Sequence, residues 1–341
     1  MRYLITLVLM TLFATVTGQN VKMVKDDAKQ KVDVLIDGTL FTSYCFPSNM
    51  EKPFLFPVYA PNGSVVTRGF PLAPRKGERV DHPHQVGIWF NHGNVNGLDF
   101  WNNSSAIPAE KKNEYGHIVV KKILKTESGK KGTLEVISEW QDNKGTTLII
   151  EDAVYIFSGD KNTRTIDHIS TLTAVKDTVI FRDNKEGMFA IRVDRAFEMP
   201  TTESVIFTDE KGNPTTVKAA DTTGVSGMYY SSNGKTGDNV WGTRNEWVIL
   251  NAKKGKVPVS LAIFDNPKNP GYPAYSHARG YGLFSVNNFG QNSYDPKMDK
   301  VNLTILKGKS VRLCHRFYIQ TGSVLTPAVA TKIFIAFANE Y

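Results

Sequence analysis

The chain has 341 residues, with 41 Lys and Arg against 33 Asp and Glu, so its formal net charge is +8. The basic residues are scattered and do not interleave with aromatic residues, which argues against a nucleic-acid surface. A chain of this length can bury a large core without staples. Its two cysteines, Cys45 and Cys314, are too few for a disulfide framework; they form one disulfide or remain two free thiols.

The first residues predict a secretory signal peptide over residues 1–18. Arg2 precedes an apolar run at 4–14, and small residues follow at 16–18. The run is too short for a membrane-spanning helix, and an uncleaved anchor is the weaker alternative. We therefore expect a periplasmic or secreted protein without membrane insertion, with one β-sandwich domain over residues 19–341. The oligomeric state is left open by the sequence.

Alternation of apolar and polar residues predicts strands along most of the chain. Residues 31–36 alternate and end at Asp37-Gly38, a strong hairpin signal. Residues 133–140 and 147–156 alternate on either side of a polar turn. The further strand candidates are residues 163–172, 179–182, 188–193 and 259–264, and residues 301–306 and 311–319, which predict a C-terminal hairpin.

One helix is clear at the C-terminus. Thr326 supplies a cap, Pro327 occupies the first helical position, and the helix should run to about Asn339. Many strands with few helices predict an all-β protein, a large antiparallel sandwich or barrel. Two stretches lack alternation, residues 71–116 and 265–297, and are rich in Gly, Pro, Asn, His and aromatic residues. Long polar and aromatic loops of this kind are where binding and catalytic sites are usually built.

The first stretch contains three of the seven histidines, His82, His84 and His92. On an extended backbone His82 and His84 would point to the same side. Together with His92 they could bind zinc, iron or copper, although no carboxylate follows closely as a cupin site would require. The competing interpretation is a metal-free polar cleft in which histidines transfer protons. The third possibility is that these histidines only hold loops together through hydrogen bonds.

The later stretches add a second set of polar residues. His277 and Arg279 would share one face of an extended segment, and three prolines between 267 and 273 stiffen the approach to it. Glu186 lies at a turn before a strand that contains Arg192, and it could be the carboxylate partner of a histidine. The spacing therefore favours a site assembled from three separate parts of the chain.

The motifs in these stretches, taken together, resemble a secreted bacterial family of unknown function that is often labelled "methane oxygenase PmoA-like". The matching motifs are residues 75–78, 82–84, 87–93 and 96–101, then Glu186-Gly187 with Arg192, and finally 266–290. Gln85 and Ser276 stand where that family commonly has a second His and a Trp. The resemblance covers about residues 30–340, and it implies a large antiparallel β-supersandwich similar to galactose mutarotases. Such folds place His, Arg and carboxylate side chains on a concave sheet facing a sugar ring.

The leading hypothesis is a carbohydrate-active hydrolase, lyase or epimerase that uses His/Glu acid–base chemistry without a cofactor. The alternatives are a non-catalytic glycan-binding protein and a metal-dependent oxidoreductase with metal at His82, His84 and His92. The expected catalytic residues are His84, His92, Glu186 and His277. The expected substrate-binding residues are Arg79, Asp81, His82, Trp89, Trp101, Arg192, Arg279 and Asn288, with Trp89 or Trp101 stacked on the sugar ring.

Overall fold

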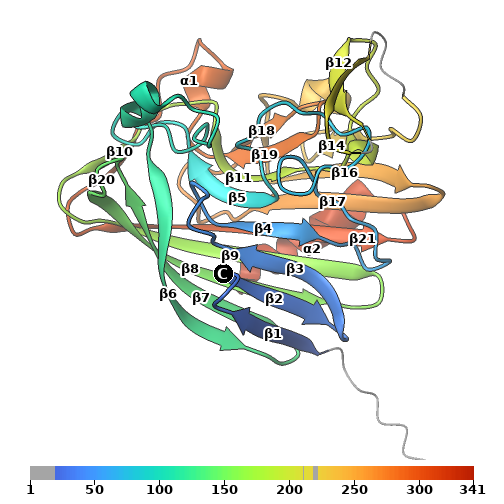
Figure 1. The fold of residues 1–341 in the computed structure, drawn as a ribbon, viewed down its shortest axis with the longest axis horizontal. Coiled ribbons are helices and arrows are strands. Elements are labelled where there is room, and N and C mark those ends of the chain that lie inside the picture. Colours follow the sequence, from blue (N-terminus) through green and yellow to red (C-terminus); the bar gives the residue numbers. More distant parts are fainter. Residues whose placement is uncertain (1–19, 210, 218–221) are drawn as a thin grey trace, which may run out of the picture.

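The computed structural model describes residues 20–209, 211–217 and 222–341. The predicted signal peptide lies outside these residues. Two large antiparallel sheets pack face to face, and Figure 1 shows the strands of both crossing the molecule side to side. This arrangement confirms the predicted antiparallel β-sandwich.

The first sheet has nine strands. In spatial order these are β1 (Val21–Asp26), β2 (Lys31–Ile36), β3 (Thr39–Cys45), β4 (Phe54–Val58), β5 (Ile88–His92), β11 (Gly187–Arg192), β19 (Leu283–Asn287), β18 (Ala274–Ala278) and β15 (Arg244–Asn245). Its centre is therefore made from segments that are far apart in the sequence. This topology brings residues near positions 90, 190 and 280 onto neighbouring strands.

The second sheet has eight strands. In spatial order these are β14 (Met228–Ser231), β16 (Trp247–Lys254), β17 (Val257–Asp265), β21 (Ser310–Thr321), β9 (Thr163–Ala174), β8 (Thr147–Gly159), β7 (Gly132–Gln141) and β6 (His117–Glu127). Two small pairs complete the strands, β10 (Val179–Phe181) with β20 (Leu303–Ile305), and β12 (Val205–Thr208) with β13 (Pro214–Val217).

The hydrophobic core fills the space between the two large sheets. Phe41, Phe90 and Phe189 come from the nine-stranded sheet, and Trp140 and Phe157 from the eight-stranded sheet; all are buried in one cluster. In β7 and β8 the buried positions alternate with more exposed ones, as the sequence pattern predicts for strands with one face toward water.

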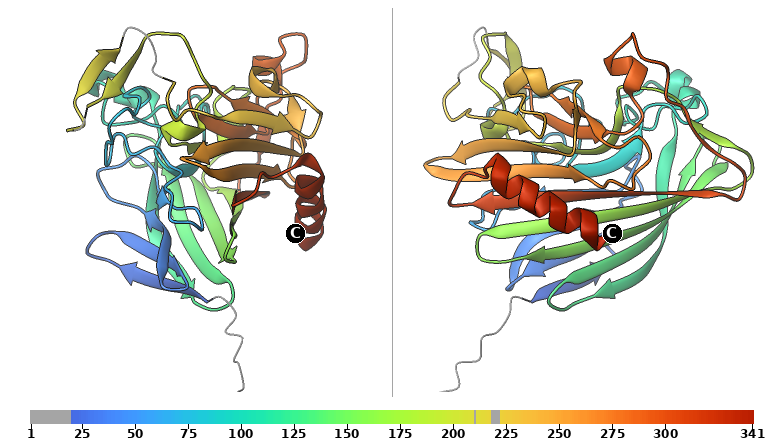
Figure 2. Two further views of the ribbon diagram at one scale, coloured as in Figure 1. Left: turned by 90° about the vertical axis from the view of Figure 1, so that its right-hand side faces the viewer. Right: turned by 180° about the vertical axis from the view of Figure 1, so that it is seen from behind.

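Helix α2 (Pro327–Glu340) covers the outer face of the eight-stranded sheet, as the view from behind in Figure 2 shows. The Thr326 side chain accepts a hydrogen bond from the Val329 amide, so the predicted helix start is confirmed. The apolar side of the helix, with Phe334 and Phe337, packs on a second cluster that includes Trp247. In the part of the chain that is described, no helix is long and apolar enough to cross a membrane.

The hairpin at Asp37-Gly38 and the pairing of β7 with β8 are confirmed. The predicted C-terminal hairpin is wrong, because β20 pairs with β10 whereas β21 lies between β17 and β9. The stretches 71–116 and 265–297 are also not loops throughout, since they contain β5, β18 and β19. These strands are buried on both faces, so their sequences show no alternation.

Cys45 and Cys314 are both free thiols. Cys45 ends β3 in the nine-stranded sheet, and Cys314 lies in β21 of the other sheet. Burial raises the pKa of Cys45 to about 11 and that of Cys314 to about 12, so both thiols remain protonated and unreactive. Of the two sequence alternatives, the free thiols are the one that the structure contains.

Candidate functional site

Four neighbouring strands of the nine-stranded sheet form the floor of the candidate site. The strand register places Trp89, Ala190, Ser285 and His277 in one row across β5, β11, β19 and β18. Their neighbours along each strand, such as Phe90 on β5, point into the sandwich core. The row therefore lies on the outer face, and in Figure 1 the segments with β12 and α1 (Gln291–Tyr294) stand above this part of the sheet.

His277 and Glu186 meet on this face. Nδ1 of His277 lies 3.7 Å from a carboxylate oxygen of Glu186. His277 comes from β18, whereas Glu186 immediately precedes β11, so the sheet joins two residues separated by ninety positions in the chain. His277 is buried and Glu186 is about one-sixth exposed. The predicted histidine–carboxylate pair is thus present as a geometric contact.

Aromatic packing holds the His277 ring in place. The Trp101 ring is nearly parallel to it at a centroid distance of 6.4 Å, and the Tyr294 ring meets it edge-on at 6.0 Å. The Tyr294 hydroxyl donates a hydrogen bond to the Lys185 carbonyl, next to Glu186. The imidazole therefore has one fixed orientation, with Nδ1 facing the carboxyl group and without a hydrogen-bond partner in the described residues.

Burial changes the protonation of both groups. It lowers the pKa of His277 to about 3, and the nearby charges of Arg279 and Lys185 act in the same direction. Burial raises the pKa of Glu186 above its ordinary value, although Lys185 opposes this shift. The imidazole is therefore neutral at physiological pH, and the raised pKa of Glu186 makes its carboxyl group a weaker acid than an exposed glutamate.

A loop at residues 79–85 forms one wall of the site, and the buried side chain of Arg68 holds it. The Arg68 guanidinium donates hydrogen bonds to the backbone carbonyls of Asp81, His82 and Gln85 at 2.8, 2.9 and 3.1 Å, and a fourth to the Asp81 carboxylate at 2.8 Å. Removing this one side chain would leave several buried acceptors unpaired. Arg68 is therefore the residue that gives the wall its shape.

Asp81 joins the wall to the floor. Its carboxylate also accepts a hydrogen bond at 2.6 Å from Arg192 on β11. Burial opposes ionisation, but His82, Arg192 and Arg68 outweigh it and hold the pKa of Asp81 below its ordinary value. Arg192 has no exposed surface and donates a further hydrogen bond to Gln85. Asp81 and Arg192 thus position the wall; the Arg192 hydrogen bonds go to Asp81 and Gln85, whereas the Asp81 side chain is about one-third exposed.

Tyr281 is the central aromatic residue of the site. The exposed His82 ring stacks on it almost parallel at a centroid distance of 5.1 Å. The guanidinium carbons of Arg192 and Arg279 lie 4.8 and 5.7 Å from the centre of the Tyr281 ring. Such cation–π contacts orient both guanidinium groups, and Arg192 makes its hydrogen bonds to Asp81 and Gln85 in the same position.

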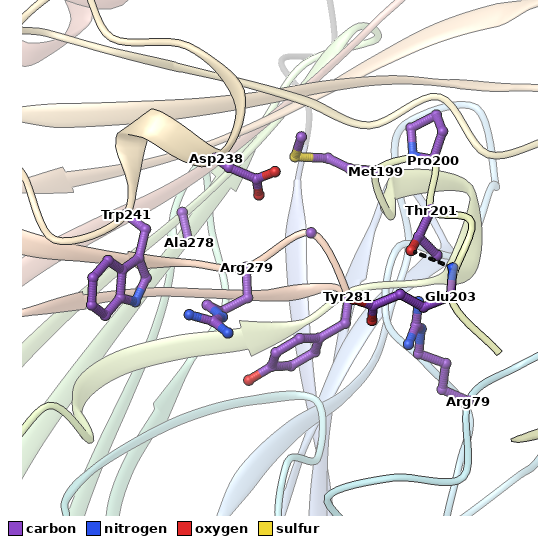
Figure 3. A pocket seen from close by; sticks show the side chains of 11 residues that line it. Arg79, Met199, Pro200, Thr201, Glu203, Asp238, Trp241, Ala278, Arg279 and Tyr281 are labelled. Atoms are coloured by element: carbon purple, nitrogen blue, oxygen red, sulfur yellow. Dashed lines mark hydrogen bonds between the residues drawn. The ribbon is translucent and has the colours of Figure 1, made fainter. Parts of the chain in front are cut away.

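A cleft of about 380 Å³ opens beside Tyr281 (Figure 3). Figure 3 shows the Arg279 side chain between Trp241 and Tyr281, and the ring of Trp241 lies 5.6 Å from its guanidinium carbon. Arg79 reaches the cleft from the loop wall and pairs with Glu198 at 2.8 Å. The remaining lining residues include Asp238, Met199, Thr201 and Glu203. Two aromatic rings with charged groups between them form a surface of the kind that binds a sugar ring.

His84 lies at the edge of this arrangement, next to a buried lysine. Its ring is 5.6 Å from that of His82, and its Nε2 has no hydrogen-bond partner in the described residues. The Lys52 amino group donates a hydrogen bond to the His84 carbonyl at 2.8 Å and lies 5.7 Å from the Trp89 ring. Burial lowers the pKa of Lys52 to about 8. His84 and Lys52 line a separate small cavity of about 30 Å³.

His92 does not join the other histidines. It shares the core-facing side of β5 with Phe90, and its Nε2 donates a hydrogen bond to the Arg182 carbonyl at 2.8 Å. Phe181 and Phe289 pack against its ring. His82, His84 and His92 therefore form no metal site, and the described residues contain no group of three or more His, Cys, Asp or Glu placed to hold a metal ion.

Three other residues that the sequence predicted to bind substrate are buried and do not face the cleft. Trp89 and Trp101 pack on each other at 5.1 Å and are 2% and 0% exposed, so neither offers a face to a sugar ring. Asn288 belongs to a buried polar cluster, where it donates hydrogen bonds to Asp265 and contacts His315. Their roles are structural, because each side chain is enclosed by other parts of the protein.

The sequence interpretation missed Arg68, Lys52, Trp241 and Tyr281. Tyr281 stands inside the motif that contains His277 and Arg279, so its position was a usable signal. Trp241 was also detectable as a tryptophan in a segment rich in Gly and Asn, where a core role is not expected. Arg68 and Lys52 are isolated basic residues, and nothing in the sequence distinguishes them from solvated ones.

Residues 31–334 match the model of a family of unknown function, DUF6807, and the chain belongs to this family. The PmoA-like label is not part of that description and stays a prediction. A search of curated proteins gave no match.

Several solved structures of sugar-processing proteins are similar to the chain. The galactosidase domain of the alpha-galactosidase-sucrose kinase AgaSK has 9% identity and a TM-score of 0.40 over 88% of this chain. The alpha-galactosidase of Lactobacillus brevis has 8% identity and a TM-score of 0.40 over 89%. This chain spans only 42% and 40% of their lengths.

A galactose mutarotase-like protein of Clostridium acetobutylicum matches along nearly its whole length. The identity is 12% and the TM-score 0.32, over 88% of this chain and 98% of the other. Sequence identities and TM-scores this low do not show that two proteins share an activity. The function is therefore argued from the residues of the site.

Proposed function

We propose that this protein is a carbohydrate-active enzyme that transfers protons with His277 and Glu186. The observation that carries the proposal is the 3.7 Å approach of the His277 Nδ1 to the Glu186 carboxylate on the outer face of the sheet. Aromatic packing holds the His277 ring in one orientation, and burial shifts both pKa values, lowering that of His277 and raising that of Glu186. Perturbed titratable pairs of this kind are concentrated at catalytic sites.

The pair suits reactions in which one proton is removed and another delivered at a sugar ring. A neutral imidazole can take a proton from a hydroxyl group or a ring carbon, and a protonated carboxyl group can supply one to a leaving or ring oxygen. Hydrolysis, elimination and epimerisation all require these two steps. The enzyme is therefore a hydrolase, a lyase or an epimerase, and the pair is compatible with each of the three reactions.

The cleft supplies binding next to the pair. Arg79, Arg279 and Asp238 offer hydrogen-bonding groups, and Met199, Trp241 and Tyr281 add apolar surface to the lining. Tyr281 lies three residues after Ala278, the end of β18, so the cleft and His277 share one short segment of the chain. His277 and Glu186 do not themselves line the cleft, so the proposal requires a bound sugar to reach from Arg279 and Tyr281 toward the buried His277.

The proposal includes export to the periplasm or the outside of the cell. It is supported by the pattern of residues 1–18, in which a basic residue, an apolar run and small residues follow one another. N-terminal sequencing of the protein isolated from its native cells should begin at Gln19. A chain that retains Met1 would contradict export by a cleaved signal peptide.

A screen of glycans for product formation tests the enzyme proposal. We expect turnover by the natural protein and its loss in the variants His277→Asn and Glu186→Gln. His117→Gln, at the start of the distant strand β6, is the matched control. Full turnover in the double variant His84→Ala, His277→Ala would overturn the proposal.

A non-catalytic glycan-binding protein is the second candidate. It is favoured by one observation, that the His277 Nδ1 atom is enclosed and not open to solvent in this structure. On this alternative the cleft at Trp241 and Tyr281 binds a sugar and the buried pair has a structural role. Glycan-array binding without product across pH 5–8 would favour it over the enzyme.

A further inference from the structure

Arg279 differs from the other arginines of the site. It follows β18 by one residue and faces the cleft, where its exposed guanidinium lies between Trp241 and Tyr281 (Figure 3). Its guanidinium carbon is 5.6 and 5.7 Å from the two ring centres. The aromatic rings therefore orient the group without using up its N–H donors.

The other arginines near the cleft are each paired with a carboxylate. Arg79 pairs with Glu198, and Arg68 and Arg192 share Asp81. For Arg279 no carboxylate in residues 20–209, 211–217 or 222–341 lies within ion-pair distance. An oriented guanidinium without a carboxylate partner, in a cleft, is available for an anion from outside.

Basic side chains lie near the two histidines of the site. Burial is the main cause of the lowered pKa of His277, and the charges of Arg279 and Lys185 act in the same direction. Burial likewise lowers the pKa of His84, and the charges of Lys52, Arg192 and Arg68 add to this shift. The carboxylates of Asp238 and Glu203 line the cleft as well, but both are exposed and suit the hydroxyl groups of a sugar. Glu186, at 3.7 Å from His277, opposes these positive charges, so the group through which the cleft would bind an anion is the Arg279 guanidinium itself.

We propose that the substrate is an acidic sugar, a uronic acid or a glycan that contains one, whose carboxylate binds the Arg279 guanidinium. A planar guanidinium matches a carboxylate through two parallel hydrogen bonds. Arg279 is two residues from His277, just beyond the end of β18, so a ring anchored at Arg279 is held next to the segment that carries His277. This inference rests on the proposed function, because it takes the cleft to be the substrate site.

Equilibrium binding tests the inference without requiring turnover. Calorimetry or intrinsic tryptophan fluorescence would be used to measure binding of D-galacturonate, D-glucuronate and their oligosaccharides, and of D-galactose, D-glucose and their neutral oligosaccharides. We expect the natural protein to prefer the uronates, and Arg279→Gln to weaken uronate binding by about 10- to 100-fold with little change for neutral sugars. Arg279→Lys, which keeps a point charge, should fall between the two.

Arg312→Gln is the matched control, since it removes the same charge from an exposed position on β21 in the other sheet. It should leave uronate affinity unchanged. Equal affinity for acidic and neutral sugars, no binding of any uronate, or an equal effect of the two variants would overturn the inference. Preference for a sulfated sugar such as galactose 6-sulfate over the uronates would also overturn it. Uronate binding that depends on Arg279 without any product would instead count against the enzyme proposal alone.

Discussion

Strands β7 and β8 of the eight-stranded sheet and strands β11 and β19 of the nine-stranded sheet are constructed differently. In β7 and β8 buried residues alternate with partly exposed ones. In β11 and β19 every residue is buried, because the loop at 79–85 and the segments above it cover the outer face. A sheet face that is covered by chain can enclose polar groups away from water, and this is where His277 meets Glu186. The contrast separates strands that supply stability from strands that form a site.

The largest expected effect is on catalysis at the covered face. Replacing Glu186 with Gln should reduce kcat by about 10²- to 10⁴-fold, because a proton donor is lost from a fixed position. The free energy of unfolding should change by less than about 1 kcal/mol, since the amide has the same shape and the residue is partly exposed. Steady-state kinetics on the glycan found in the screen, with thermal unfolding in parallel, measures both. A large loss of stability would show that Glu186 is structural.

On the alternating strands β7 and β8 we expect substitutions to change the free energy of unfolding rather than the activity. Phe157→Ala on β8 removes a fully buried ring from the main core and should cost about 3–5 kcal/mol of unfolding free energy. Ile150→Ala on the exposed face of the same strand should cost less than about 1 kcal/mol. Urea unfolding compares the two variants. Similar costs at both positions would contradict the one-sided burial of β8.

A substitution that disturbs the loop at 79–85 should lower the free energy of unfolding by less than the core substitution Phe157→Ala. Arg68→Met leaves the carbonyls of Asp81, His82 and Gln85 without their donor, and we expect a cost of about 2–3 kcal/mol. The loop at 79–85 should also become sensitive to limited proteolysis. Cleavage sites mapped by mass spectrometry would check this, with Arg312→Gln as the control. An intact loop in Arg68→Met would mean that Arg192 alone can hold Asp81.

The smallest effect concerns the dependence of stability on pH. Burial lowers the pKa of His168 in the core to about 3, so its folded pKa lies below the unfolded value. As the pH falls below about 6.5, the unfolded chain binds a proton that the folded protein does not, and stability is lost. His168→Phe should reduce the slope between pH 6.5 and 5.5 by about 1 kcal/mol per pH unit. An unchanged slope in urea titrations would show that His168 is charged in the folded protein.

The sequence predicted the two kinds of strand unequally well. The alternating segments at 133–140, 147–156 and 163–172 were found as strands, because one face is wet and the pattern is visible. The strands β5, β18 and β19 were taken as loops, because residues buried on both faces show no alternation. For the same reason β20 and β21 were joined as a hairpin, although their neighbours in the chain are not their neighbours in the sheets.

By itself the sequence determined the β-rich class, the capped C-terminal helix and the identity of the polar motifs, since these depend on local composition and spacing. It also singled out His277, Arg279 and Glu186 by their motifs. Only the tertiary structure decided which residues meet. The side of the strand on which a residue falls depends on register, and register is set by pairing between distant segments. For this reason His92 faces the core and Arg192 donates its hydrogen bonds to Asp81 and Gln85. Arg279 faces the cleft, where its guanidinium has no carboxylate partner among the described residues.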